Sequence, residues 1–345
     1  MRAGMHGVTL FFVVSAFTLM RSLHIRIDKE HMPIHKYLLR RFFRIAPAYY
    51  FVLISVFCLY GKGFLAYANP QDATLTWPDL ATHMLFVNSL FPFYANDFLG
   101  VEWSVSTEFM FYMLLPFLFL WLNKTSTIIQ ATIKIGLLSL TAIVLYWLIY
   151  FRGDYLRVLG GGFDSTVFSA WSYFFIATHL QTFVVGVAIW LAIKLKSSNN
   201  PKAVSRQQTK LALTGLICAA ITGAYIEGYR LSDSYIVWGG LIFWGLLSAA
   251  LIFVLNSMRP ANVAGLRILT ELGKVSFSLY LVHFPICAGL SKLPKVWWKI
   301  TQLPEVNFLL YVIVVFGLAY YSARLLFHFV EKPGIELGRV VIARL

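Results

Sequence analysis

Long apolar stretches alternate with short polar connections along most of the chain. Nine of them approach the about 20 mostly apolar residues that a membrane-spanning helix needs. They cover roughly residues 7–22, 45–61, 103–122, 135–151, 171–193, 211–226, 235–256, 275–291 and 307–327. A shorter apolar stretch from Leu80 to Phe93 predicts a re-entrant or interfacial helix. The pattern therefore predicts an all-α, polytopic integral membrane helix bundle with about nine spans.

The polar connections leave no room for a soluble domain. The longest of them runs from about Lys62 to Gly100, and the chain contains neither an internal repeat nor a low-complexity tract. We therefore expect residues 1–345 to form a single transmembrane domain.

The composition agrees with this pattern. Hydrophobic residues make up 59% of the 345 positions and charged residues 13%, whereas soluble domains have about 45–50% and 25%. The 30 Phe, 18 Tyr and 10 Trp residues suit the aromatic belts at membrane surfaces. The three cysteines are far apart within apolar runs, which predicts small buried hydrophobes rather than a disulfide framework or a metal site.

The net charge of +14 is unevenly distributed between the two sets of connections. Roughly three quarters of the 29 Lys and Arg residues lie in alternate connections and in the C-terminal tail. Because basic residues are retained on the cytoplasmic side, we expect a multi-pass protein with a cytoplasmic C-terminus and an outside N-terminus. Lys202 then lies inside and Asp72 outside. The charge is explained by this topology, so we expect no nucleic-acid partner.

A basic cluster marks the start of the second predicted span, where the sequence from Arg40 to Pro47 is RRFFRIAP. Arg41 and Arg44 are three residues apart, which places them on neighbouring positions of one helix face. Guanidinium groups at this depth suit phosphate binding. Anchoring by positive charge on the cytoplasmic side explains the same residues, and charge alone favours that reading.

An acidic residue lies inside the third predicted span, in the sequence WSVSTEFMFY from Trp103 to Tyr112. Glu108 follows Trp103 by about 7–8 Å along a helix. A carboxylate at this depth has to be paired, protonated or turned to a water-filled cavity. Tyr112, four residues later, is in reach of a hydrogen bond with it. A catalytic role and a structural pair with an arginine both remain open.

A histidine lies in the eighth predicted span, in the sequence from Gly273 to Pro285. Its imidazole, at His283, suits a general base, a proton relay or a packed hydrogen-bond partner. His31 and His35 have metal-ligand spacing, but Pro33 between them breaks a common helical face. We therefore expect no metal and no bound cofactor.

Together these segments resemble the bacterial membrane acyltransferase 3 family, which includes O-antigen acetylases and related O-acyltransferases. The resemblance spans nearly the whole chain, in the right order. It rests on GVTLFFVVSAF at residues 7–17, RRFFRIAP at 40–47, WSVSTEFMFY at 103–112, LGKVSFSLYLVH at 272–283 and EKP at 331–333. Ala16 stands where the family usually has Gly.

The resemblance implies a family fold of ten spans and transfer of an acyl group, commonly acetyl, from cytoplasmic acyl-CoA to a saccharide hydroxyl. Acyl-CoA is then a co-substrate, and the acceptor is a cell-surface saccharide or a lipid-linked glycan. Glu108 and His283 match positions of catalytic or relay groups. The implied substrate-binding positions are Arg41, Arg44, Trp103, Ser106, Tyr112, Ser278 and Tyr280.

One departure from the family pattern concerns its first helix, which carries an Arg and, about ten residues later, a catalytic His. Only six residues precede Gly7 here. The odd number of spans also asks for one more helix at this end. We therefore expect that the chain from residue 1 to 345 lacks this helix, and that it is inactive without it.

Two other functions fit the same residues. A transporter or flippase of a lipid-linked saccharide would use Glu108 and His283 as a proton path. A remnant that has lost its first helix would have no activity. The expected location is the bacterial inner membrane, with the bilayer as partner, while the sequence leaves the oligomeric state open.

Overall fold

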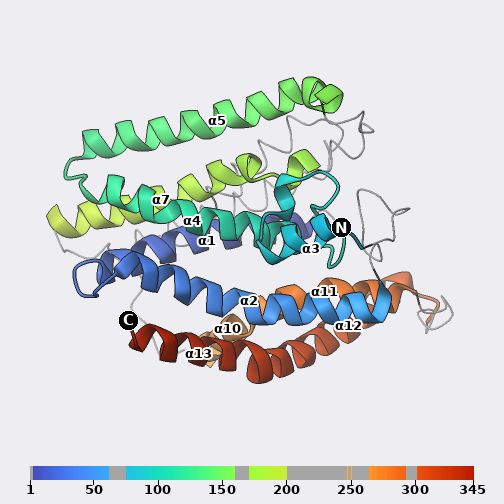
Figure 1. The fold of residues 1–345 in the computed structure, drawn as a ribbon. Helices are drawn as coiled ribbons and strands as arrows, with labels where there is room; N and C mark the ends of the chain where they lie inside the picture. Colours follow the sequence, from blue (N-terminus) through green and yellow to red (C-terminus); the bar gives the residue numbers. More distant parts are fainter. Residues whose placement is uncertain are drawn as a thin grey trace. The chain divides into compact units, whose positions relative to one another are not determined.

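The computed structural model describes residues 3–61, 75–159, 171–199, 247, 250, 264–292 and 301–345. Every regular element within these ranges is helical (Figure 1). This confirms the predicted all-α class. The chain is a multi-pass membrane protein, because six of the described helices are long and apolar enough to cross a bilayer.

The spanning helices correspond to six of the predicted stretches. Five of them lie in α1 (Ala3–Arg26), α2 (Pro33–Tyr60), α4 (Glu102–Asn123), α5 (Ile128–Leu159) and α7 (Ile176–Asn199). The sixth span, Pro304–Ala343, joins α12 (Pro304–Leu326), the π-helical turn η3 (Phe327–Glu331) and α13 (Lys332–Ala343). The predicted stretch 275–291 forms the shorter apolar helix α11 (Ser276–Ser291) after α10 (Ala264–Lys274). The stretches 211–226 and 235–256 lie almost wholly outside the described residues, so nine spans remain a prediction.

The apolar stretch before α4 forms α3 (Trp77–Met84) and the turn η1 (Asn88–Leu90). Thr76 and Asp79 close the start of α3 as a capping box. The Thr76 N–H donates to the Asp79 carboxylate at 2.8 Å, and the Asp79 N–H donates to the Thr76 hydroxyl at 3.4 Å. This segment is too short to span a bilayer.

The chain divides into two compact units, and neighbouring parts of the sequence alternate between them. The described part of the first unit contains α1, α4 from Phe111 onward, α5 and α7. Within it, α7 packs against both α1 and α5. Gly186 lets α7 approach the backbone of α1 closely, because a Cβ there would meet the Val13 carbonyl. Stacked rings of Phe12, Phe111 and Phe183 fill the interior, with centroids 3.9–4.6 Å apart.

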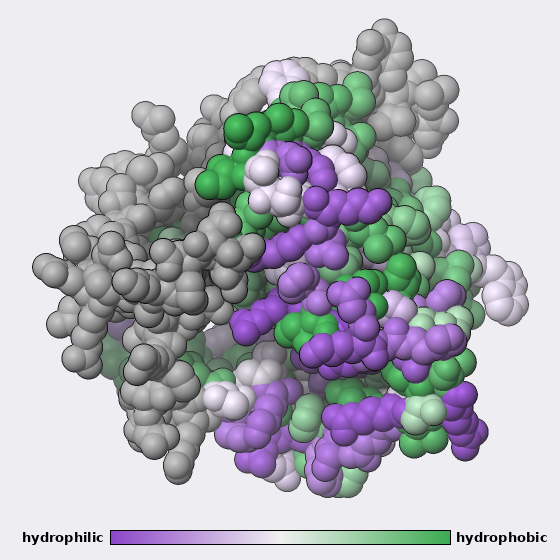
Figure 2. Space-filling view, turned by 90° about the vertical axis from the view of Figure 1, so that its left-hand side faces the viewer, coloured by the Kyte–Doolittle hydropathy of each residue, from purple (hydrophilic) through white to green (hydrophobic). Residues whose placement is uncertain are grey.

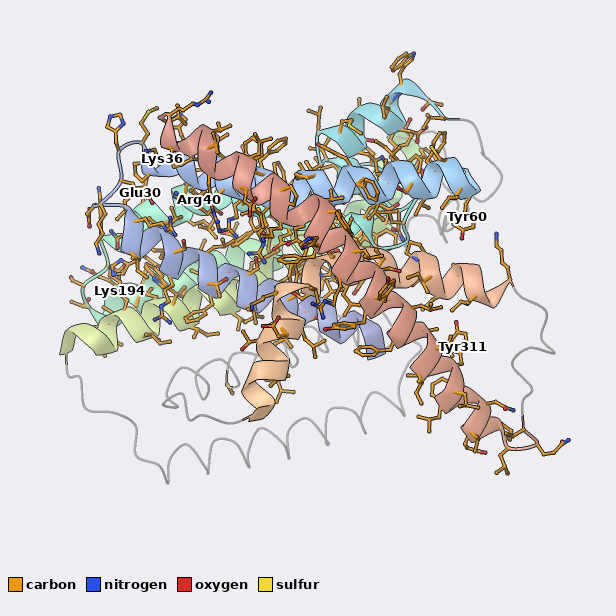
Figure 3. The ribbon with its side chains drawn as sticks, turned by 90° about the horizontal axis from the view of Figure 1, so that it is seen from below. Glu30, Lys36, Arg40, Tyr60, Lys194 and Tyr311 are labelled. Carbon is orange, nitrogen blue, oxygen red and sulfur yellow. The ribbon has the colours of Figure 1, made fainter. Side chains whose placement is uncertain are left out.

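The described part of the second unit contains α2, α3, η1, α4 up to Met110, residues 171–174 and α10 to α13. Helix α11 packs along α12, where the Tyr311 hydroxyl donates to the Cys287 carbonyl at 3.3 Å. Figure 3 shows Lys36 and Arg40 near the start of α2 and Tyr60 at its far end. The Tyr60 hydroxyl lies beside Gly289 of α11. These contacts hold α11 between α12 and the end of α2.

Two glycines bring α13 against α2. Gly334 and Gly338 have the small-xxx-small spacing that lets membrane helices approach closely. A Cβ at Gly334 would lie 2.5 Å from Pro47 Cγ, and one at Gly338 would lie 2.6 Å from Phe43 Cβ. The RRFFRIAP segment of α2 is therefore covered by the C-terminal helix.

The outer faces of the helices are those of a membrane protein. Apolar side chains of α5 and α12 are widely exposed, including Ile129 at 73% and Phe308 at 69%. Water does not favour such faces, but lipid does. Figure 2 looks onto the end at which α1 finishes, and hydrophilic side chains gather there among apolar ones. Arg26 and Glu30 form an exposed ion pair at 3.0 Å at this end.

Candidate active site

The first turns of α4 carry an unusual number of buried polar groups. Glu102, Ser104, Ser106, Thr107 and Glu108 are all at most 3% exposed. Polar groups are costly inside a membrane helix and usually serve a partner or a function. The hydrogen-bond partners of each side chain show whether it holds the fold together or is available for a reaction.

Glu102 has a structural task. Its carboxylate accepts hydrogen bonds from the backbone N–H groups of Phe98, Leu99 and Val101, at 2.7, 2.9 and 3.1 Å. A carboxylate at a helix N-terminus also complements the helix dipole. Glu102 therefore fixes the loop that leads into α4.

Ser106 and Thr107 attach two neighbouring segments to α4. The Ser106 hydroxyl donates to the Phe86 carbonyl at 2.8 Å and lies 3.1 Å from the Ser89 hydroxyl. The Thr107 hydroxyl donates to the Phe174 carbonyl at 3.1 Å. The hydroxyl of Ser106, a predicted substrate-binding residue, therefore forms its hydrogen bonds with other parts of the polypeptide.

The ring of Trp103 packs against the segment that Thr107 holds. Its centroid lies 5.2 Å from both Tyr173 and Phe174, and the Phe174 ring is stacked on it. Trp103 is 5% exposed, so packing accounts for much of its environment.

A hydrogen bond joins α4 to the serine- and tyrosine-rich start of α11. The hydroxyl oxygens of Ser104 and Tyr280 are 2.6 Å apart, and the Ser104 hydroxyl donates to the Val101 carbonyl at 2.9 Å. The charges of Glu102 and Glu108 both act on the Tyr280 hydroxyl. The predicted residue Tyr280 is therefore joined to the start of α4 through Ser104.

His283 lies one turn further along α11, and its geometry defines its tautomer. Nδ1 is 2.6 Å from the Tyr280 carbonyl oxygen. A carbonyl oxygen only accepts, so Nδ1 must carry the proton. In the neutral ring Nε2 then keeps its lone pair and is the basic nitrogen. The imidazole is half-buried and lies 5.5 Å from the Tyr280 ring, centroid to centroid.

The two arginines of the basic cluster have different surroundings. Arg41 is half-buried, and its charge, like that of Glu108, acts on the hydroxyl of Tyr37. Arg44 is exposed, and its charge acts on the carboxylate of Glu331.

Glu331 is a buried acid that the sequence pattern had not marked as a site residue. It is 1% exposed and accepts a hydrogen bond of 2.6 Å from the hydroxyl of the predicted residue Ser278. It ends η3, where the Lys332 N–H bonds the Phe327 carbonyl five residues back. Such π-helical turns are common at functional sites.

Tyr112 belongs to the first unit, where its hydroxyl lies 3.4 Å from that of Ser15 on α1. The first unit also holds a buried histidine, His179 on α7, which is 1% exposed and packs edge-on against Phe12. Its position within an apolar stretch was the only sequence signal for it. Among the described residues, no group of three or more His, Cys, Asp or Glu side chains is arranged to hold a metal ion.

The basic cluster and Glu331 lie on helices long and apolar enough to cross a membrane, and His283 lies on the shorter apolar helix α11. The family described as "Acyltransferase domain" matches residues 2–324. The chain belongs to this family, the acyltransferase 3 family of membrane proteins, as its motifs indicated.

Similar proteins of known name are acyltransferases as well. O-acetyltransferase OatA of Staphylococcus aureus is 27% identical over 96% of this chain and 52% of its own length. Peptidoglycan O-acetyltransferase OatA of Listeria monocytogenes is 23% identical over 96% of this chain and 51% of its own. Acyltransferase MdmB of Streptomyces mycarofaciens is 24% identical over 82% of this chain and 68% of its own length. The chain thus spans about half the length of the OatA proteins it matches. No solved structure matches it.

Proposed function

We propose that this chain transfers an acyl group, in practice acetyl, from acyl-CoA to a hydroxyl of a cell-surface saccharide or lipid-linked glycan. Family membership supports the reaction class. The observation that carries the proposal is the tautomer of His283, whose Nδ1 faces the Tyr280 carbonyl at 2.6 Å and whose Nε2 is the basic nitrogen.

In this proposal Nε2 of His283 takes the proton of the acceptor hydroxyl as its oxygen attacks the thioester carbonyl carbon. The carbonyl becomes a tetrahedral oxyanion. In this proposal the Tyr280 hydroxyl turns away from Ser104 to donate to it, while the Ser104 hydroxyl keeps its bond to the Val101 carbonyl. The C–S bond then breaks, and the protonated imidazole returns the proton to the leaving thiolate. The products are an O-acyl ester and free CoA.

Glu108 supports this step through charge. Its carboxylate acts electrostatically on the Tyr280 hydroxyl, one turn of α11 before His283. Glu108 is therefore a positioning and electrostatic residue in this mechanism.

Arg41 and Arg44 are assigned to the phosphates of acyl-CoA. Guanidinium forks match phosphate oxygens in two-point hydrogen bonds. The proposed location is the bacterial inner membrane, with the basic end of α1 and α2 and the C-terminus on the cytoplasmic side, where acyl-CoA is available.

The test is acyl transfer by the purified chain in liposomes. Acetyl-CoA labelled in the acetyl group is supplied with a saccharide acceptor, and labelled ester and free thiol are measured together. The proposal expects one thiol released for each ester formed. Thiol release without ester, or neither product, would contradict it.

A further inference from the structure

Two tyrosine hydroxyls on α2 are buried and have no hydrogen-bond partner in the described part of the chain. Tyr37 is 2% exposed and Tyr49 is 0% exposed. Tyr50, on the same helix, shows the usual arrangement, because its hydroxyl donates to the Met84 carbonyl at 2.5 Å. A buried hydroxyl without a partner destabilises the fold and calls for an explanation.

Packing explains the burial of Tyr49. Its ring lies against Tyr50 and Phe86, with centroids 5.5 and 5.0 Å away. Tyr37 differs from Tyr49 in having a cation among its neighbours, whereas the charge that acts on Tyr49 is that of Glu102. Tyr37 lies one helical turn before Arg41, and the charges of Arg41 and Glu108 both act on its hydroxyl. Tyr37 is therefore the unpartnered donor that has an arginine one helical turn away.

The position of Tyr37 indicates what it binds. Lys36 and Arg40 flank it on the first turns of α2 (Figure 3), and Arg41 is half-buried beside it. Three basic side chains around this tyrosine favour an anionic or strongly polarised oxygen as the acceptor of its hydrogen bond. A phenol hydroxyl and a guanidinium on successive turns can bond two oxygens of one ligand.

We propose that the Tyr37 hydroxyl is a binding residue for the acyl donor and donates a hydrogen bond to one of its oxygen atoms beside Arg41. This rests on the proposed function, since it assigns the donor to the basic end of α2. The acceptor oxygen belongs either to a phosphate of the donor or to a carbonyl of its pantetheine arm. Both kinds of oxygen accept a hydrogen bond, and the Tyr37 hydroxyl has a proton to donate.

Tyr37→Phe removes the hydroxyl alone, and Tyr50→Phe is the matched control on the same helix. The binding of acetyl-CoA to each purified variant is measured by calorimetry, and the melting temperature of each is measured without ligand. S-acetylpantetheine, which lacks the phosphates, is measured in parallel.

For Tyr37→Phe we expect an unchanged or higher melting temperature without ligand and acetyl-CoA affinity lowered by about three- to tenfold, which is the loss of one hydrogen bond. Tyr50→Phe is expected to lower the melting temperature and to leave the affinity unchanged. If the Tyr37 effect is absent with S-acetylpantetheine, the acceptor is a phosphate oxygen; if it persists, the acceptor is a carbonyl. Both outcomes support donor binding.

Two results would overturn the inference. Unchanged acetyl-CoA affinity in Tyr37→Phe, with normal binding by the parent chain, would refute the role of Tyr37 and leave the proposed function standing. Absence of acetyl-CoA binding in the parent chain itself would refute the proposed donor and, with it, this inference.

Discussion

An alanine at Gly334 measures how closely α13 packs on α2. The added Cβ would lie 2.5 Å from Pro47 Cγ and 3.2 Å from the Phe43 carbonyl oxygen. Carbon atoms in ordinary contact are about 3.5–4.0 Å apart, so Pro47 has to retreat by about 1 Å. Overpacking of this kind costs about 1–3 kcal/mol.

The helix propensity of alanine works in the opposite direction. Replacing Gly by Ala inside a helix stabilises it by about 0.8–1 kcal/mol. Gly317 supplies the matched control, because a Cβ there meets nothing within 4 Å on the same continuous helix. Since the propensity gain is common to both variants, the difference between them isolates the clash, which we expect to be about 1–3 kcal/mol.

The assay is unfolding of the purified variants by SDS in mixed micelles, followed by helical circular dichroism. Gly317→Ala is expected to be as stable as the parent chain or more so, and Gly334→Ala clearly less stable than Gly317→Ala. Equal stability of the two variants would show that α13 does not pack on the RRFFRIAP segment as described.

Three further predictions concern charge. Glu108→Gln keeps the size of the side chain but removes its charge, so transfer should fall by about 10- to 100-fold at normal expression; an undiminished rate would make Glu108 structural. Arg44→Lys should weaken acetyl-CoA binding several-fold because the planar fork is lost, whereas Arg26→Lys, in an exposed ion pair, should leave calorimetric affinity unchanged. In a variant without native cysteines, an impermeant thiol reagent applied from outside should label a cysteine at Gln302 but not one at Asp28; the opposite labelling would reverse the orientation.

Hydrophobic pattern predicted the spans well where charge is sparse, and less well at their charged ends. Helix α2 begins at Pro33, twelve residues before the predicted start at about residue 45. The basic residues of its first turns interrupt the apolar run, but the helix is amphipathic there and buries Tyr37. The last span likewise continues past Leu326, through the π-helical turn η3 into α13, with Pro333 in the first turn of α13.

Motifs predicted which segments carry chemistry, but not which partners their residues have. The resemblance pointed to Tyr280 and His283, and the structure adds the backbone bond that defines the imidazole tautomer. The bond between Ser278 and Glu331 joins residues 53 positions apart, and the unpartnered hydroxyl of Tyr37 depends on neighbours in other helices. Such tertiary contacts leave no periodic signal in a sequence.

The family pattern and our proposal assign the catalytic base to different residues. The resemblance implies a His in a helix ahead of Gly7, whereas the described residues offer His283. A base ahead of Gly7 predicts that the chain from residue 1 to 345 is inactive. His283 as the base predicts that this chain transfers acyl groups.

The most direct measurement compares acetyl transfer by the parent chain with that by His283→Gln and His24→Gln. His24 is exposed and lies 3.3 Å from the Asn123 side chain, so it controls for loss of an imidazole as such. If His283 is the base, its replacement lowers the rate by about 10²- to 10⁴-fold, while the His24 variant keeps the parent rate. A parent chain without transfer, or a His283 variant with the parent rate, would contradict the account and place the base elsewhere.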